Sequence, residues 1–387
     1  MSLKPEQNTL LTRIEGDAPM GRYLRETAWF PAVISSVLEA GGDPYPVRLL
    51  GENFVAFRGE DGRVGFFSEY CPHRGVSLLL ARNEDNALRC IFHGWKFRSD
   101  GVTVEAPTQT TEHDAFCKKV PLEHYPTREA AGVVWVWLGE AEPPPLPDFE
   151  FMSMGGENLH VTRTIVDFNW IQANEGLVDS AHVAVLHQDW LNRMVNNPKL
   201  ANAAHDTAPV YEFENRPDGF RYAAIREVPE EQRYIRVTEF TQPFYSFIPS
   251  DQGACFICVP IDDMRTALWA VRYAPDKPIN DSPWKPAPDP MNWPPKLPGD
   301  KSNRWGQDRQ SMRDGSSFSG FNEHFLHEDL AVAVSQGPIA DRRKEFLNGG
   351  DQGVVMMRSL LLRRARDFEA GKVTPHTPPD PAIRIAA

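Results

Sequence analysis

The sequence predicts an α+β protein of two domains: a small all-β domain near the N-terminus, and a larger domain in which helices cover an antiparallel sheet. Three observations predict it. The chain has 387 residues, which is enough for about two to three domains. Prolines cluster between 143 and 147 and again between 275 and 298, and such runs interrupt regular structure. Short strand-like segments fill the chain before the first cluster, whereas strands and helical segments mix after it.

The first domain is expected at residues 25–145. Its segments NFVAFRG, RVGFFSEY and GVVWVWLG have the composition of strands, and Asp-Gly pairs at 61–62 and 100–101 mark turns. The apolar segment GVVWVWLG resembles a buried strand and runs into the first proline cluster. We interpret that cluster as the exit from the domain, in which no long helix is expected.

The second domain is expected to comprise residues 1–24 and 146–387. Its strand candidates include FRYAAIREV, YIRVTEF and ACFICVPI, and its helix candidates span about 169–186, 322–335 and 353–370. The proline-rich stretch 275–298 is expected as an ordered surface excursion or a partner arm, or as a loosely held loop. The tail after Val373 is expected as an extended arm.

Composition limits the classes of function. Apolar residues make up 41% and charged residues 24%, as in folded globular proteins. The net charge of −12 opposes binding to nucleic acid and to anionic membranes. No apolar run has the length of a membrane span, and the N-terminus lacks a signal-peptide pattern, so we expect a cytoplasmic protein. Five cysteines are too few, and odd in number, for a disulfide framework.

Two of these cysteines have the spacing of metal ligands. Cys71 and His73 form one short pair, Cys90 and His93 a second, and each pair lies beside a glycine that lets the backbone approach a metal closely. The order alternates Cys, His, Cys, His, whereas zinc sites usually pair like with like. Alternation suits a Rieske [2Fe–2S] centre, in which one iron takes two thiolates and the other two imidazoles. A structural zinc site, or unligated core residues, is the alternative.

A second group of candidate ligands lies in the helix candidate 169–186 and just after it. With Asp179 as reference, His182 and His187 are about 140° apart on an ideal helix. That is too wide for one metal, so we expect a widened turn, or His187 at the end of the helix. Two histidines and one carboxylate hold iron and leave positions open for O2 and substrate. Asp179 lies between the histidines, which suits a hydrogen bond to a ligand ring better than ligation.

The third ligand is sought in FNEHFLHEDLAVAVS, where Glu328 and Asp329 compete. A helical wheel places Asp329 within the apolar face and Glu328 on the polar face, near His324. Because a buried carboxylate needs a cation, Asp329 is the predicted ligand. His324 and His327 are expected to be a solvated pair on the polar face.

Other candidates carry weaker signals. Arg226 and Arg236 lie in two of the expected strands. We expect them either to bind a substrate carboxylate or to pair with Glu227 and Glu239. Cys255 and Cys258 lie three apart in a strand candidate, so their side chains point to opposite faces and no metal role is expected.

Taken together, CPHRG…CIFHGWKF resembles the Rieske domain of the ring-hydroxylating, non-haem iron oxygenases, and Asp179-x-x-His182-x-x-x-x-His187 resembles their catalytic motif. The resemblance covers nearly the whole chain and is closest to the oxygenase (alpha) components of the phthalate dioxygenase-like branch, partly through SQGPIADRR. It implies a larger domain of the helix-grip, START-like type that holds mononuclear Fe(II). The implied ligands are Cys71, His73, Cys90 and His93 for the cluster, and His182, His187 and Asp329 for the iron.

The resemblance also implies an activity and partners. Asp179 would pass electrons from the Rieske centre of a neighbouring subunit, in a homotrimer or stacked trimers. The expected reaction is the O2-dependent cis-dihydroxylation of an aromatic carboxylate, phthalate- or benzoate-like, in aromatic hydrocarbon catabolism. An O-demethylating monooxygenase of a methoxy-aromatic is the first alternative, and a zinc-stabilised, non-enzymatic binding protein is the second.

The electrons would come from a separate reductase that carries flavin and a plant-type iron–sulfur cluster and oxidises NADH. No G-x-G-x-x-G follows a strand candidate in this chain, which fits indirect use of NADH. A basic patch that includes Arg74 and Lys96 is the expected docking surface for this reductase.

Overall fold

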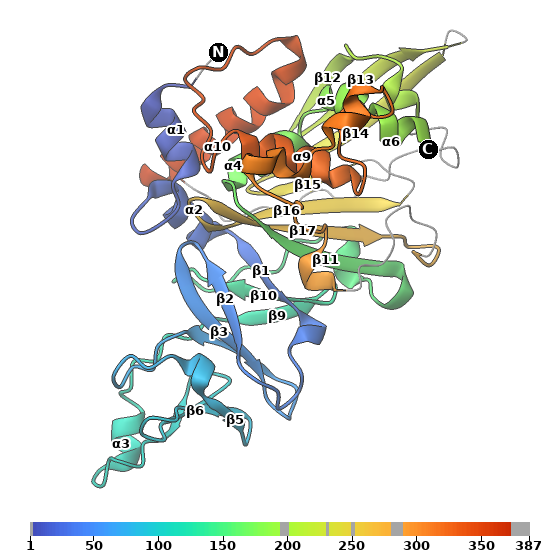
Figure 1. The fold of residues 1–387 in the computed structure, drawn as a ribbon. Helices are drawn as coiled ribbons and strands as arrows, with labels where there is room; N and C mark the ends of the chain where they lie inside the picture. Colours follow the sequence, from blue (N-terminus) through green and yellow to red (C-terminus); the bar gives the residue numbers. More distant parts are fainter. Residues whose placement is uncertain (1–2, 194–200, 230–231, 249–251, 280–288, 373–387) are drawn as a thin grey trace. The chain divides into compact units, whose positions relative to one another are not determined.

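The computed structural model describes residues 3–193, 201–229, 232–248, 252–279 and 289–372 (Figure 1). The chain forms two compact units, Arg25–Leu146 and Met1–Leu24 with Pro147–Ala387. Each unit has its own sheets and its own core. Within the described ranges, no helix combines the length and the apolar composition needed to cross a membrane.

The smaller unit is built from short antiparallel strands in three sheets. Glycines with positive φ make two of its tight turns, at Gly62 (φ 82°) and Gly101 (φ 81°), where the sequence predicts them. Its one α-helix among the described residues, α3 (His113–Cys117), is short. The sheets are β1 (Trp29–Ile34), β10 (Val133–Trp137) and β9 (Thr127–Ala130); β2 (Tyr45–Leu49), β3 (Glu52–Arg58) and β4 (Val64–Ser68); and β5 (Arg82–Glu84), β6 (Ala87–Arg89), β7 (Lys96–Arg98) and β8 (Thr103–Glu105).

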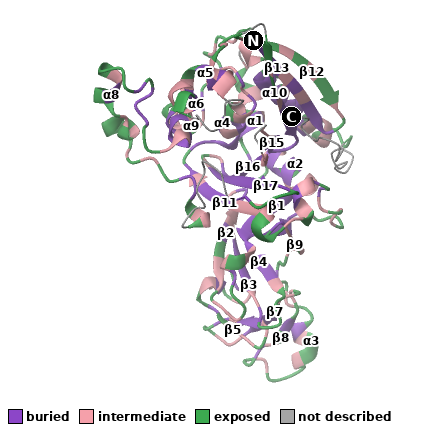
Figure 2. Cartoon of the chain, turned by 90° about the vertical axis from the view of Figure 1, so that its right-hand side faces the viewer, coloured by how far each residue is buried: buried purple, intermediate pink, exposed green. Residues whose placement is uncertain are grey.

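The larger unit contains a seven-stranded antiparallel sheet in the order β11-β17-β16-β15-β14-β13-β12. Two long interior strands, β16 and β17, are buried along almost their whole length (Figure 2). The strands are β11 (Leu159–Val166), β12 (Val210–Arg216), β13 (Gly219–Val228), β14 (Gln232–Thr241), β15 (Tyr245–Phe247), β16 (Gly253–Asp262) and β17 (Arg265–Tyr273).

Helices α4, α9 and α10 cover one face of this sheet (Figure 1). This arrangement confirms the predicted α+β class. The helices that the larger unit contains or begins are α1 (Pro5–Thr12), α2 (Pro19–Thr27), α4 (Trp170–Leu177), α5 (His182–Leu186), α6 (Gln188–Arg193), α8 (Arg309–Arg313), α9 (Phe325–Ser335) and α10 (Gln352–Glu369).

The prediction of one helix over 169–186 is wrong, because the chain breaks between α4 and α5. Side chains of the sheet capture the carbonyl groups that a continuous helix would use. The hydroxyl of Tyr222 donates to the Val178 carbonyl (2.9 Å), and the Arg226 guanidinium donates to the Ser180 carbonyl (2.6 Å). The carboxylate of Asp179 accepts the Ala181 N–H (2.8 Å), a local bond that competes with helix.

The described part of the proline-rich stretch packs on the larger unit. Trp293 is buried, and its backbone N–H donates to the Arg163 carbonyl of β11 (3.2 Å). This part is therefore an ordered excursion, which is one of the alternatives expected from the sequence. Residues 280–288 of the predicted excursion, and the predicted arm after Val373, lie outside the described residues.

Candidate metal centres and substrate pocket

Two loops of the smaller unit have the same backbone conformation. In each, the cysteine N–H donates to the carbonyl five residues later, and the glycine N–H donates back to the cysteine carbonyl, at 2.8 to 2.9 Å. The glycines, Gly75 and Gly94, have φ of 69° and 75°, a conformation that side chains disfavour. The repeated turn presents Cys71 and Cys90 in equivalent ways.

In these two loops the cysteine side chains lie together and the histidine side chains lie together. Cys71 and Cys90 are both buried, and they contact each other; burial and this neighbour raise the pKa of Cys71 to about 11. The rings of His73 and His93 lie together with centroids 4.5 Å apart, and His73 also stacks on Trp95. Two thiols together and two imidazoles together are the donor set that a [2Fe–2S] cluster with unlike irons needs.

A single zinc ion fits these loops poorly. Among the described residues, only one group of three or more side chains places its ligand atoms within 4.8 Å of one another, and it lies in the larger unit. The Nδ1 atom of His93 is buried and has no hydrogen-bond partner within the described chain. A buried ring nitrogen without a partner is costly unless it binds a metal, so the loops fit the cluster.

The prediction of a basic docking patch that includes Arg74 and Lys96 is wrong for Lys96. The ammonium group of Lys96 is buried between Asp85 (2.6 Å) and Glu105 (3.7 Å), so its charge is already neutralised. Arg74 is exposed, and its guanidinium lies 5.2 Å from the centre of the Phe92 ring.

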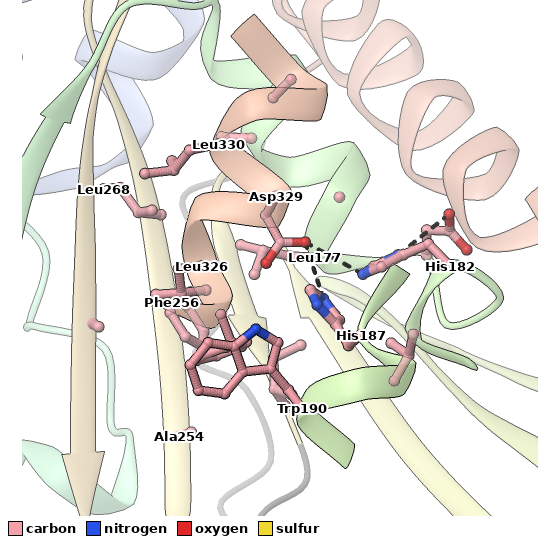
Figure 3. Close-up of a pocket in the computed structure, with 18 of the residues that line it drawn as sticks. Leu177, His182, His187, Trp190, Ala254, Phe256, Leu268, Leu326, Asp329 and Leu330 are labelled. Carbon is pink, nitrogen blue, oxygen red and sulfur yellow. Dashed lines mark ion pairs between the residues drawn. The ribbon is translucent and has the colours of Figure 1, made fainter. Parts of the chain in front are cut away.

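In the larger unit the structure brings His182, His187 and Asp329 together (Figure 3). The Oδ1 atom of Asp329 lies 3.5 Å from Nε2 of His182 and 3.2 Å from Nε2 of His187. His187 is the C-cap of α5, with φ −95° and ψ 12°, so it lies at the end of a helix, one of the two outcomes expected from the 140° spread. The three side chains leave one side of the group open to the pocket.

Asp179 lies behind one of these histidines. Its Oδ2 atom is 3.4 Å from Nδ1 of His182, the ring nitrogen that faces away from Asp329. Burial alone would raise the pKa of Asp179, but the hydrogen bond and the charge of His182 outweigh it and hold this pKa below its ordinary value. Asp179 is therefore placed to orient the His182 ring.

The helical wheel misplaced Glu328 and the two histidines on α9. Glu328 is 1% exposed, and its Oε2 atom lies 2.6 Å from Nδ1 of His187. His327 is 3% exposed and bonds the Pro295 carbonyl (3.1 Å), while His324 caps the helix by accepting the Leu326 N–H. The pair is therefore not solvated. Segments distant in sequence cover the outer face of α9, and a wheel cannot show that cover.

The two candidate arginines have different surroundings. Arg226 is completely buried and binds the carbonyl groups of Ser180 and Asp206, and it does not line the pocket. This corrects the expectation that it meets substrate; it holds the Asp179 loop instead. The predicted pairing with Glu227 is also wrong, because Glu227 pairs with Arg233 (2.9 Å).

Arg236 does line the pocket. Its Nε atom is buried and has no hydrogen-bond partner among the residues that the structure describes. The alternative pairing with Glu239 is wrong, since residues three apart on a strand point to opposite faces. In the sheet Arg236 is paired with Ala224, and Glu239 with Arg221.

The pocket has a volume of about 190 Å³ and lies between α4, α9 and the sheet (Figure 3). Apart from Arg236, a second arginine, Arg272, reaches it; burial lowers the pKa of Arg272 to about 10, so it stays protonated at neutral pH. Arg272 donates to Gln252 (2.8 Å). Most of the wall is apolar, and includes Leu177, Phe256, Leu268, Trp293, Phe325 and Leu326.

Comparison with known proteins agrees with this geometry. Residues 28–126 match the model of the Rieske [2Fe-2S] domain, and residues 136–383 match the model described as "LigXa C-terminal domain like". The chain belongs to the Rieske non-haem iron aromatic ring-hydroxylating oxygenases. As the oxygenase component of such a system it carries a Rieske cluster, and the family implies a mononuclear iron; the zinc-stabilised binding protein is excluded.

Relatives of this oxygenase act on several aromatic compounds. It is 37% identical to the phthalate 4,5-dioxygenase oxygenase subunit of Pseudomonas putida (96% of this chain, 88% of the relative). It is 36% identical to the 3-chlorobenzoate-3,4-dioxygenase oxygenase subunit of Comamonas testosteroni (96% and 90%). It is 28% identical to the 5,5'-dehydrodivanillate O-demethylase oxygenase subunit of Sphingobium sp. (99% and 85%).

Solved structures share the fold of the oxygenase. The terminal oxygenase of carbazole 1,9a-dioxygenase from Nocardioides aromaticivorans IC177 superposes with a TM-score of 0.60 at 20% identity, covering 89% of this chain and 97% of that chain. A carbazole 1,9a-dioxygenase oxygenase solved in a reduced complex with its ferredoxin gives a TM-score of 0.61 at 20% identity, covering 95% and 98%.

Proposed function

We propose that this oxygenase acts on an aromatic carboxylate with a single ring and converts it to a cis-dihydrodiol. One observation carries the proposal: Arg236 brings a buried, unpartnered guanidinium nitrogen into an otherwise largely apolar pocket beside the histidines and Asp329. A buried polar group without a partner is costly, and a carboxylate is the partner that a guanidinium binds best.

The size of the pocket supports one ring. An engineered apolar cavity of about 150 Å³ holds benzene, and the present pocket, at about 190 Å³, leaves room for one further small substituent. Phe256 and Leu268 from the sheet and Phe325 from α9 line its wall. These side chains would hold the ring by its faces and exclude water, while Arg236 binds the carboxylate and so sets which ring edge faces the metal ligands.

We further propose that the cluster ligands are Cys71, His73, Cys90 and His93, and that His182, His187 and Asp329 hold Fe(II). When bound, these groups supply one-electron transfer and O2 activation. The dihydroxylation adds both atoms of O2 to two adjacent ring carbons and consumes two electrons and two protons. The electrons would come from NADH through a flavin and iron–sulfur reductase.

The proposed role of Asp179 is to couple the two centres. Its carboxylate orients His182 from behind, and in a homotrimer or stacked trimers it would face the Rieske centre of a neighbouring subunit. Arg226 keeps Asp179 in place through the Ser180 carbonyl (2.6 Å). The electron path therefore depends on residues of the break between α4 and α5.

The second candidate function is O-demethylation of a methoxy-aromatic. The match to the demethylase relative along almost the whole chain supports it. The same residues would orient the substrate with its methoxy group, in place of a ring edge, toward the metal ligands. Hydroxylation of the methyl carbon would then release formaldehyde.

A product survey separates the two functions. The purified oxygenase, supplied with O2, NADH and a reductase of the family, is incubated with benzoates, phthalates and methoxybenzoates. We expect cis-dihydrodiols from a benzoate or phthalate, whereas formaldehyde from a methoxybenzoate alone would establish the demethylase. Iron and acid-labile sulfide are measured on the same preparation; fewer than about three irons and two sulfides per chain in active protein would overturn the two-centre assignment.

A further inference from the structure

Each histidine of the proposed iron site has a carboxylate next to Nδ1, the ring nitrogen that does not face Asp329. Asp179 stands behind His182 and Glu328 behind His187, in each case at Nδ1. The second contact is the shorter of the two, 2.6 Å against 3.4 Å. We infer that Glu328 is a positioning residue that orients the His187 ring and keeps its Nδ1 protonated, so that Nε2 is free to bind the metal; this inference rests on the proposed iron site.

The geometry of Glu328 leaves it little freedom. Its Oε2 atom faces Nδ1 of His187 and its Oε1 atom accepts the hydroxyl hydrogen bond of Ser319, so both carboxylate oxygens have a partner. The side chain is 1% exposed. A carboxylate held at both oxygens cannot follow a rotating ring, and therefore fixes the ring.

The segment that brings Ser319 to Glu328 is itself tied to the helix after His187. The Phe318 N–H donates to the carboxylate of Asp189 in α6 (2.6 Å). Gly320 has φ 76°, and a Cβ there would lie 2.7 Å from the Asp308 carbonyl oxygen. This backbone turn therefore favours glycine. Both features hold the segment that carries Ser319 in place, and Ser319 in turn holds Glu328 beside His187.

The consequence for a metal follows from the two ring nitrogens. A neutral imidazole carries its proton on one nitrogen and offers a lone pair on the other. A carboxylate at Nδ1 holds the proton there, which leaves the lone pair on Nε2, and this atom faces Asp329 Oδ1 at 3.2 Å. The same contact makes the ring a stronger donor, and losing such a partner commonly weakens metal binding about 10- to 100-fold.

The test measures binding of Co²⁺ alone to protein that lacks the mononuclear metal but retains its cluster. Glu328→Ala removes the contact and Glu328→Gln keeps an acceptor oxygen without the charge. The matched control is Glu323→Gln, an exposed position just before α9. The Kd for Co²⁺ and its EPR spectrum are recorded with the cluster oxidised, and cluster absorbance checks that each variant is folded.

We expect one Co²⁺ per chain in the wild type and in Glu323→Gln, with the same spectrum. In Glu328→Ala the Kd rises about 10- to 100-fold, and in Glu328→Gln the rise is smaller, with an altered spectrum because the ligand ring is a weaker donor. If Glu328→Ala fails to fold, Glu328→Gln and Ser319→Ala decide, since each leaves the core volume nearly unchanged.

Two results would overturn the inference in distinguishable ways. If both Glu328 variants bind Co²⁺ with the Kd and the spectrum of Glu323→Gln, Glu328 has no positioning role, and the iron site itself stands. If the wild type binds no Co²⁺, or binds it with a Kd that His187→Ala leaves unchanged, the proposed metal site fails, and the role of Glu328 fails with it.

Discussion

The Oδ2 atom of Asp179 lies 3.4 Å from Nδ1 of His182, and the other nitrogen of the same ring lies 3.5 Å from Oδ1 of Asp329. One imidazole thus connects a carboxylate in the α4–α5 break with the carboxylate on α9. The connection exists because the chain leaves helical geometry at Val178 and re-enters it at His182.

Replacing Asp179 with Asn should leave both metal centres occupied while steady-state turnover collapses. The amide oxygen can still accept the Ala181 N–H, which the carboxylate accepts at 2.8 Å, so the local fold is preserved. The negative charge behind His182 is lost. Metal content and turnover are measured on the same sample. Unchanged turnover would remove Asp179 from the electron path.

Replacing Arg236 with Met should raise KM for the carboxylate substrate about 10- to 100-fold, the effect of losing a hydrogen bond to a charged group. The KM for an uncharged analogue such as benzamide should change little. Arg233→Met is the matched control, because Arg233 lies on the same strand, is exposed and pairs with Glu227. Equal changes in KM for benzoate and benzamide would contradict carboxylate binding by Arg236.

Replacing Glu239 with Gln should stabilise the protein at pH 8 and have little effect at pH 5. Burial, reinforced by Asp218 and opposed by Arg216, raises the pKa of Glu239 from 4.5 to about 7. The folded state thus holds a proton that the unfolded chain releases, and stability falls as pH rises from 4.5 to about 7.

Above pH 7 the buried charge costs on the order of 3 kcal/mol, which the variant avoids. Thermal midpoints at pH 5 and pH 8 measure the difference. Glu227→Gln, which changes an exposed glutamate, should shift neither midpoint. A stabilisation of Glu239→Gln that is the same at both pH values would show that Glu239 does not titrate in this range.

Replacing Cys71 or Cys90 with Ala should abolish the cluster, whereas replacing Cys255 or Cys258 should retain it. Cys255 and Cys258 are fully buried in β16, where burial raises the pKa of both thiols and so disfavours the thiolate that binds metal. Visible absorbance and sulfide content measure the cluster. Cluster loss in the Cys255 or Cys258 variants, with the fold intact, would contradict the assignment.

The sequence by itself determined the fold class, the family and the residues proposed as metal ligands. Cys71, His73, Cys90 and His93 lie within two short loops, and the glycines that shape those loops are adjacent in sequence. Asp179, His182 and His187 likewise share one short segment. Local spacing is sufficient for such groups, because short segments restrict where their side chains can meet.

Only the tertiary structure decided the surroundings of those residues. Glu328 is buried beside His187, which lies 141 residues earlier in the chain. Arg226 and Arg236 have different roles because Arg226 binds the Ser180 carbonyl, whereas Arg236 lines the pocket. The physical reason is that burial and hydrogen-bond partners depend on segments far apart in the chain. Helical or strand periodicity describes one element alone, and so cannot show which distant segment packs on it.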